Sequence, residues 1–216
     1  MQPTPQADSV IEAARKTALA LDLPWSEVQP IYRALQAEDG AGGSWLPKSV
    51  GRTIFTAHPG YIARLVIALG FRAGGLAPSE ANCLARGLTL EGRPMSITDW
   101  PAAGVVGPVE AILSRLLTTP EASETVEAVC FDAAAKTITI RHTDGHKLHL
   151  SPTDEGMWSP GWDMHRDAIL AVLAQDTARP LSGIGVIDGS VFSKVARTVA
   201  WRTGPSPVRH GDDNDE

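Results

Sequence analysis

One segment of the sequence has the residue types that bind phosphate. The stretch from 41 to 79 contains four Lys or Arg residues and no Asp or Glu. Phosphates of DNA are held by Lys and Arg, by Ser and Thr hydroxyls and by backbone N–H groups. The stretch therefore predicts a surface that contacts double-stranded DNA. The candidate DNA-binding residues are Lys48, Ser49, Arg52, Thr53, His58, Tyr61 and Arg64.

The charge distribution along the chain is consistent with this prediction. The protein has 216 residues and a net charge of −6. Residues 1–79 carry seven Lys or Arg against six Asp or Glu, whereas residues 80–216 carry twelve against nineteen. Such asymmetry is typical of a chain with one part that faces nucleic acid. The alternative, which the sequence leaves open, is that the stretch lacks acids only because it is mostly apolar.

The other residues that could act in catalysis or metal binding lack the partner residues that such a site needs. His142, His146 and His149 lie within eight residues of one another, but a zinc site needs further ligands and neither cysteine is close in sequence. The "HRD" at 165–167 lacks the rest of a kinase catalytic loop, and the glycines of "SGIGV" at 182–186 are predicted to form a turn. We therefore expect no enzyme activity, no catalytic residues, no metal and no cofactor.

Apolar residues at helical spacing occupy most of the first 118 residues. Val10, Ile11 and Ala14 begin one face of a first helix, and Ser26 and Ser79 are expected to cap two later ones. The segment after Pro47 predicts either a short helix or an extended basic loop. The expected helices before residue 120 lie around 10–21, 26–35, 59–70, 80–88 and 109–116.

The apolar period then changes from 3.6 to 2, which predicts strands near 126–131, 136–142 and 146–151. A two-residue turn at the last hairpin would mix its two faces. A three-residue turn over 143–145, with Gly145 in the left-handed conformation, keeps the apolar residues on one face. It also places His142 opposite His146. Two further helices are expected around 163–175 and 190–201.

These elements predict an α+β fold. A helical, DNA-binding-like N-terminal domain would be followed by a small three-stranded antiparallel sheet with two C-terminal helices. The expected divisions are a flexible N-terminus (1–8), a helical domain with a helix-turn-helix-like segment (9–120), a small α+β domain (121–203) and a disordered acidic tail (204–216).

Three short motifs occur in order within residues 20–72. They are Leu46-Pro47-Lys48, Gly51-Arg52 and Ala63-Arg64-Leu65, the last followed by Ile67-Ala68-Leu69. On these motifs, residues 20–72 resemble the N-terminal region of small regulators from alphaproteobacterial prophages and gene transfer agents. Family members often have a denser run of Lys, Arg and Gly where this chain has "SVGRTIFTA". The resemblance implies a DNA-binding transcriptional regulator of phage-like or gene-transfer-agent genes.

The expected partners are double-stranded DNA and a protein of the transcription machinery, and homo-oligomer formation is left open. The alternative function is a phage-derived assembly or adaptor protein that binds other proteins without contacting DNA. The N-terminus does not resemble a secretory signal and no apolar run is long enough to span a membrane, so a cytoplasmic location without membrane contact is expected. Cys83 and Cys130 are expected to be buried thiols.

Overall fold

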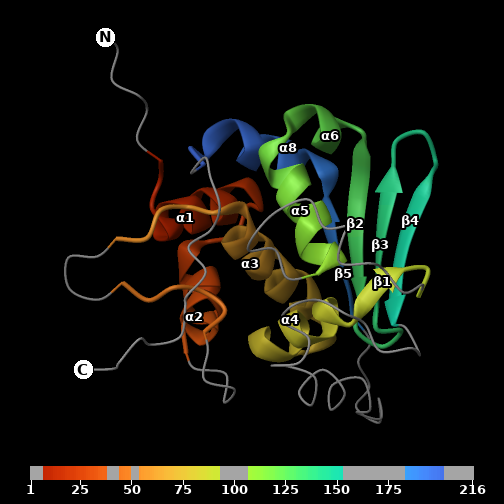
Figure 1. The fold of residues 1–216 in the computed structure, drawn as a ribbon, viewed down its shortest axis with the longest axis horizontal. Coiled ribbons are helices and arrows are strands. Elements are labelled where there is room, and N and C mark those ends of the chain that lie inside the picture. The colour runs from red at the N-terminus through yellow and green to blue at the C-terminus, as the bar shows by residue number, and fades with distance from the viewer. Residues whose placement is uncertain (1–6, 38–43, 50–53, 93–106, 153–182, 202–216) are drawn as a thin grey trace, which may run out of the picture.

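The computed structural model describes residues 7–37, 44–49, 54–92, 107–152 and 183–201. These residues form an α+β fold of N-terminal helices, a five-stranded antiparallel sheet and a C-terminal helix (Figure 1). The predicted fold class is therefore confirmed at this level. The helices are α1 (Val10–Ala20), α2 (Trp25–Leu35), α3 (Pro59–Phe71) followed by the 3-10 turn η1 (Arg72–Gly74), α4 (Pro78–Arg86), α5 (Pro108–Thr118), α6 (Pro120–Glu124) and α8 (Gly189–Thr198).

Two of the expected helix starts are wrong. Helix α2 begins after Pro24 and α4 begins at Pro78, so neither Ser26 nor Ser79 is the cap. A proline suits the start of a helix because its φ is already helical and its missing N–H would have no partner there. At α4 the Glu80 carboxylate accepts a hydrogen bond of 2.8 Å from the N–H of Ala77.

The segment between α2 and α3 shows no helix in its described residues, 44–49 and 54–58. Thr56 instead forms an antiparallel bridge with Ser9, just before α1. Of the two alternatives at this segment, the described residues therefore adopt the extended one.

The sheet has five strands, in the order β1-β4-β3-β2-β5, so the expectation of three is wrong. The three predicted strands are present, and the hairpin register is confirmed: Ile138 lies opposite Leu150, Ile140 lies opposite Leu148, and Gly145 has a φ of 86°. The strands are β1 (Leu88–Leu90), β2 (Val126–Asp132), β3 (Thr137–His142), β4 (Lys147–Pro152) and β5 (Ile184–Asp188).

The two strands that the sequence analysis missed lie at the two ends of the sheet. β1 is only three residues long, too short for an alternating pattern to show. β5 contains Gly185 and directly follows Gly183, the two glycines of 182–186 that were expected to form a turn. A Cβ at Gly183 would overlap the carbonyl oxygen of Ala73, and a Cβ at Gly185 would overlap that of Gly70. The glycines therefore allow the end of α3 to lie directly against β5.

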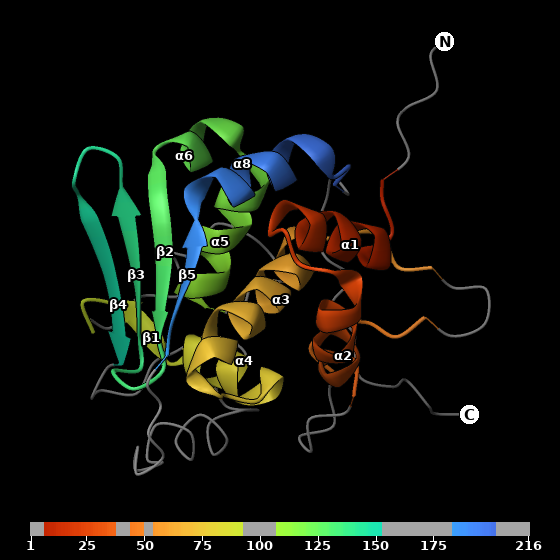
Figure 2. The same cartoon turned by 180° about the vertical axis from the view of Figure 1, so that it is seen from behind.

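The helices cover one face of the sheet, and Figure 2 shows this layer from behind. Helix α3 is central: ten of its thirteen residues are buried, and Phe71 packs edge-on against Phe131 of β2 with ring centroids 5.3 Å apart. Helices α1 and α2 lie at the end of the molecule away from β3 and β4 (Figures 1 and 2).

The buried side chains of the described residues form one continuous cluster that includes both the helices and the sheet. This cluster crosses the domain boundary expected at residue 120. Asp8, expected in a flexible N-terminus, is also held in place, because its N–H donates to the carbonyl of Ala200 and its carbonyl accepts from Ala57. The expected helix at 163–175 and the acidic tail at 204–216 lie outside the described residues.

No single helix in the described ranges is long and apolar enough to cross a membrane. Only α3 with η1, taken together with α4, meets that test of length and composition, and this pair is bent by 108°. Both cysteines are free: Cys83 is buried, as expected, and Cys130 is half-buried.

Candidate functional site

The structure separates the seven predicted DNA-binding residues. Lys48 and Ser49 are exposed on the segment after α2. Arg52 and Thr53 lie outside the described residues. The other three belong to one largely buried cluster at the start of α3: His58, Tyr61 and Arg64.

Arg64 is the centre of this cluster and pairs with Glu110 of α5. Its Nε donates to Oε2 over 3.1 Å and its Nη2 donates to Oε1 over 3.0 Å, while Nη1 donates to the carbonyl of Trp45 over 2.9 Å. Arg64 is 9% exposed and Glu110 is 4% exposed. A guanidinium held in two parallel hydrogen bonds inside the core cannot reach a phosphate. Arg64 is therefore not a candidate for DNA contact.

His58 and Tyr61 organise the first turn of α3. His58 is the N-cap residue, and its Nδ1 accepts a hydrogen bond of 3.2 Å from the N–H of Gly60. The rings of His58 and Tyr61 meet edge to face with centroids 5.7 Å apart, and the Arg64 guanidinium lies 5.6 Å from the Tyr61 ring centroid. An added Cβ at Gly60 would lie 2.6 Å from Glu110 Oε1. The first turn of α3 is thus packed tightly against Glu110 of α5.

A groove lies beside the N-terminal end of α1, and we call it the α1 groove. It consists of two adjoining cavities, of about 180 Å³ and about 600 Å³, which share Ser9, Ile11 and Ile54 in their linings. Tyr32 and Phe55 also line the smaller cavity, which is therefore mainly apolar. The other lining residues are Val10, Pro47 and Ser49 in the smaller cavity and Ala7, Asp8, Glu12, Arg15 and Thr56 in the larger one.

Two large apolar side chains of the α1 groove face solvent: Ile11 is 38% exposed and Ile54 is 71% exposed. From the sequence, Ile11 was expected on the buried face of its helix, and Ile54 was expected as an apolar residue of the possible short helix after Pro47. The adjacent Val10 is buried, at 3% exposure. Neighbouring residues lie about 100° apart around a helix, so Val10 and Ile11 do not face the same way. That spacing was the signal available in the sequence.

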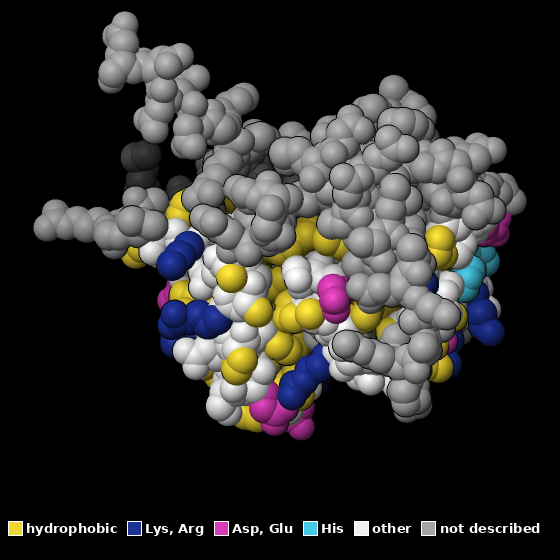
Figure 3. Space-filling model, turned by 90° about the horizontal axis from the view of Figure 1, so that it is seen from below, with side chains coloured by type: hydrophobic (Ala, Val, Ile, Leu, Met, Phe, Trp, Pro, Cys, Tyr) yellow, Lys and Arg dark blue, Asp and Glu magenta, His cyan; other side chains and the backbone are white. Residues whose placement is uncertain are grey.

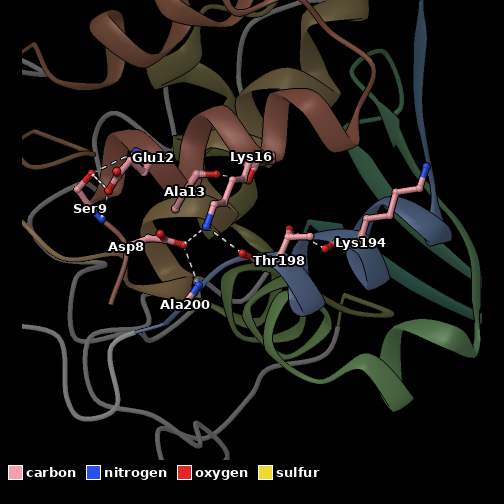
Figure 4. Close-up of polar contacts among 9 residues, drawn as sticks. Asp8, Ser9, Glu12, Ala13, Lys16, Lys194, Thr198 and Ala200 are labelled. Atoms are coloured by element: carbon pink, nitrogen blue, oxygen red, sulfur yellow. Dashed lines mark hydrogen bonds and ion pairs between the residues drawn. The ribbon is translucent and has the colours of Figure 1, made fainter. Parts of the chain in front are cut away.

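Hydrogen bonds hold Asp8, which lines the larger cavity of the α1 groove, and Figure 4 shows these contacts. Lys16 Nζ donates to Asp8 Oδ2 over 2.6 Å and to the carbonyl of Thr198 over 2.9 Å, and the N–H of Ala200 donates to the same carboxylate oxygen of Asp8. Partial burial acts to raise the pKa of Asp8, but the hydrogen bonds from Lys16 and Ala200 and the charge of Lys16 lower it overall. The start of α1 is thereby joined to the end of α8.

The first turn of α1 has its own cap. The Ser9 hydroxyl accepts from the N–H of Glu12, and the Glu12 carboxylate accepts from the N–H and the hydroxyl of Ser9. These bonds lower the pKa of Glu12 and keep its carboxylate charged at neutral pH. A carboxylate on the rim of the α1 groove disfavours a phosphate there.

Tyr32 of α2 lines the smaller cavity, and Gln36, the C-cap residue of α2, contacts Tyr32. Gln36 Nε2 donates to the carbonyl of Pro47 over 2.8 Å and lies 3.4 Å from the Tyr32 hydroxyl. Burial raises the pKa of Tyr32 above its usual value near 10, so its hydroxyl is protonated at neutral pH. Positive charge on the rim comes from the exposed Arg15, whose guanidinium lies 5.5 Å from the Trp25 ring centroid. The exposed Lys48, between the lining residues Pro47 and Ser49, adds a second positive charge nearby.

The histidines lie on the β3–β4 hairpin, away from the α1 groove. His142 donates its N–H to the carbonyl of His146 over 2.8 Å, and their ring centroids are 5.8 Å apart, which confirms the expected pairing. His149 Nδ1 is 3.0 Å from the hydroxyl of Thr139. No group of three or more His, Cys, Asp or Glu residues in the described ranges is placed to hold a metal ion.

Figure 3 shows the face seen from below, on which the described Lys and Arg side chains are scattered among apolar and uncharged ones, with acidic side chains nearby. They form no continuous basic band on the part of this face that the described residues make up. Phosphate binding by several charges at once requires such clustering. The chain matches no protein-family model, and no curated protein or solved structure is significantly similar to it.

Proposed function

We propose that the protein is an adaptor that binds another protein through the α1 groove. The observation that carries the proposal is the pair of exposed isoleucines, Ile11 and Ile54, which line one concave surface. Exposed apolar side chains that gather at a concavity with a polar rim are typical of protein-binding sites. In the setting that the family resemblance implies, the adaptor would serve assembly of a phage-derived particle.

The partner segment would insert an apolar side chain between Ile11 and Ile54. The rim charges define the rest of its chemistry. Asp8 is neutralised by Lys16, whereas Arg15 and Lys48 have no carboxylate at ion-pair distance within the described residues. A partner carboxylate beside the inserted apolar side chain would therefore be attracted to this rim.

Selection of peptides on the intact protein tests this proposal. A displayed library would be selected on the wild-type chain, and the affinity of the enriched peptides would then be measured by fluorescence polarisation. We expect enriched peptides to combine an apolar residue with Asp or Glu. Replacement of Ile54 by Glu (Ile54→Glu) should weaken them by about tenfold or more, which corresponds to about 1.4 kcal/mol.

The matched control is Leu19→Glu. Leu19 is also on α1 and is 79% exposed, but it does not line the α1 groove. Peptides should bind this variant as they bind the wild type. Equal binding to all three proteins, or loss of binding in both variants, would rule out the α1 groove as the site.

The second candidate is the DNA-binding regulator of phage-like or gene-transfer-agent genes. It is supported by the exposure of Lys48 and Ser49, adjacent residues that both have phosphate-binding side chains. Arg52 and Thr53 follow them closely in sequence. On this reading the segment after α2, and not α3, contacts DNA, and the sheet with α8 recruits a protein of the transcription machinery.

The salt dependence of DNA binding distinguishes the two candidates. Each neutralised phosphate contributes about −0.9 to the slope of log K against log salt concentration. If Lys48 binds a phosphate, Lys48→Ala should make the slope less steep by about one unit, and Arg52→Ala should do the same. The matched control is Arg72→Ala, because Arg72 is exposed but pairs with Glu27 on another surface. Unchanged slopes in both test variants would leave the adaptor proposal.

A further inference from the structure

Strand β5 is the last strand of the sheet, and within the described residues it pairs only with β2. Its other edge therefore presents the N–H and C=O groups that point away from β2. Ile184 and Val186 are each 58% exposed and lie on the same face of the strand, opposite Asp132 and Cys130 of β2.

Natural proteins usually protect such an edge with charged side chains, proline or a bulge. Residues 183–187 contain no charged residue and no proline. The pairing of β5 with β2 has no bulge. Asp188 ends the strand, but its carboxylate accepts a hydrogen bond of 2.8 Å from the N–H of Ser190 and caps α8. Within the residues that the structure describes, the edge is thus apolar and carries none of these protective features.

We propose that β5 pairs with β5 of a second copy of this chain, antiparallel, with Gly185 on the two-fold axis. In this register Ile184 lies opposite Val186 of the partner subunit, and the same apolar pair forms again on the other side of the axis. The two five-stranded sheets join into one continuous sheet.

The strand sequence favours its own copy as the occupant because it complements itself in this register. A register centred on Val186 would place Ile184 opposite Asp188 of the partner subunit, which pairs an apolar side chain with a charge. With Gly185 on the axis, the two Asp188 residues are six positions apart along the pair, or about 20 Å. That distance exceeds the Debye length of about 8 Å at physiological salt, so their repulsion is screened.

Two packing features support this register. Gly185 has no side chain on the helix-covered face, and its tight contact with Gly70 holds β5 rigidly in place. Ala73, in the turn η1 that follows α3, is small and exposed, so its side chain adds little bulk beside Gly183, the residue before β5. The edge is only five residues long, so the dimer should be weak and its population should depend on concentration.

Sedimentation equilibrium over a range of protein concentrations tests the dimer. The wild-type mass should rise from the monomer value of 22.9 kDa toward twice that value. Val186→Lys should stay monomeric, because a lysine on the edge opposes strand pairing. The control Leu19→Lys makes the same kind of change at an exposed apolar residue far from β5 and should associate as the wild type does. A monomeric wild type, or equal association of all three proteins, would overturn the proposal.

Disulfide capture tests the register. The chains would carry Cys130→Ser, because Cys130 lies opposite Val186 within one chain and could capture a new cysteine there. A mixture of Ile184→Cys and Val186→Cys chains should cross-link mainly as the mixed pair. Self-linked Val186→Cys as the main product would overturn the register with Gly185 on the axis.

Discussion

The role of Arg64 depends on the residue with which it pairs and does not follow from its residue type alone. In the sequence it lies in a stretch of 39 residues without an acid, so it was assigned to DNA. In the structure its guanidinium is bound to Glu110, which lies 46 residues away in sequence. The positive charge of a buried arginine is satisfied by one carboxylate, wherever in the chain that carboxylate is found.

Removing the charge of Glu110 should strongly destabilise the protein. Glu110→Gln leaves the Arg64 guanidinium buried without a counter-charge, and breaking a buried pair in this way costs about 3–5 kcal/mol. The free energy of unfolding, measured by urea titration at pH 7, should fall by that amount. The control Glu121→Gln removes an exposed carboxylate of α6 and should change it by no more than about 0.5 kcal/mol.

The double variant Arg64→Met with Glu110→Leu distinguishes the net contribution of the ion pair to stability from the cost of leaving one buried charge without its partner. Replacing both members by apolar residues of similar size removes both buried charges, so the double variant should be more stable than Glu110→Gln. If the Glu110→Gln protein were as stable as the wild type, Arg64 and Glu110 could not be buried away from water as they are in the structure.

Asp8 gives the protein a pH-dependent contact between α1 and α8. Its folded-state pKa lies below the ordinary value of 3.8, so its contribution to stability is present above about pH 4 and is lost as the pH falls through the lowered pKa. Asp8→Asn should therefore lower the free energy of unfolding at pH 7 by about 1–3 kcal/mol. The difference from the wild type should shrink toward zero below that pKa.

Urea titrations at pH 7, 5 and 3 measure this dependence. The exposed Asp22→Asn variant is the control and should follow the wild type at every pH. A difference for Asp8→Asn that is the same at pH 7 and pH 3 would contradict the role of the charged carboxylate.

At the scale of elements, the contact between α3 and the strands depends on glycines. Gly70 lies against the ring of Phe131, and Gly185 lies against the backbone of Gly70. A Cβ at either position would overlap its neighbour. The spacing between helix and sheet is normally set by side chains, but here the backbone of α3 contacts the backbone of β5 directly.

Gly185→Ala should therefore destabilise the fold by about 3 kcal/mol or more, because backbone on both sides cannot move aside as a side chain can. The control is Gly145→Asn in the β3–β4 turn. Gly145 has a φ of 86°, which asparagine tolerates, and an added Cβ there would meet nothing within 4 Å. Thermal unfolding should show a large fall in the melting temperature for Gly185→Ala and a small one for Gly145→Asn. Equal falls in melting temperature for the two variants would mean that the backbone of α3 does not contact the backbone of β5 closely.

At the scale of the whole molecule, contacts cross the expected boundary at residue 120. Phe71 of α3 packs edge-on against Phe131 of β2, Lys16 of α1 donates a hydrogen bond to the carbonyl of Thr198 in α8, and β1 pairs with β4. Next to the boundary, the Ser123 hydroxyl of α6 lies 2.8 Å from that of Ser193, which holds α6 against α8. The division into a helical domain and a small α+β domain stays a prediction, but a continuous core favours one cooperative unit.

Cooperative unfolding would appear as a single transition. Tryptophan fluorescence and far-UV circular dichroism should give coincident urea curves. Limited proteolysis of the native protein should leave residues 118–125 uncut, since α6 is packed against α8. Two separate transitions, or early cleavage between 118 and 125, would support the two-domain division instead.

The sequence by itself determined the elements whose patterns are local. The β2–β3–β4 meander was predictable because alternation and the turn at Gly145 depend on neighbouring residues, and the central positions of α1, α3, α5 and α8 were predictable from helical spacing. Pro59 marks a helix start by chemistry that acts within one turn.

Only the tertiary structure decided what each surface does. The α1 groove brings Ile11 beside Ile54, β5 joins a sheet whose other strands end about thirty residues earlier, and Arg64 meets Glu110. Each of these contacts joins residues distant in sequence. Local spacing carries information about which face of an element is apolar, but not about which distant residue covers that face or leaves it exposed. For that physical reason the sequence predicted an exposed Arg64 and a buried Ile11, whereas in the structure Arg64 is buried and Ile11 is exposed.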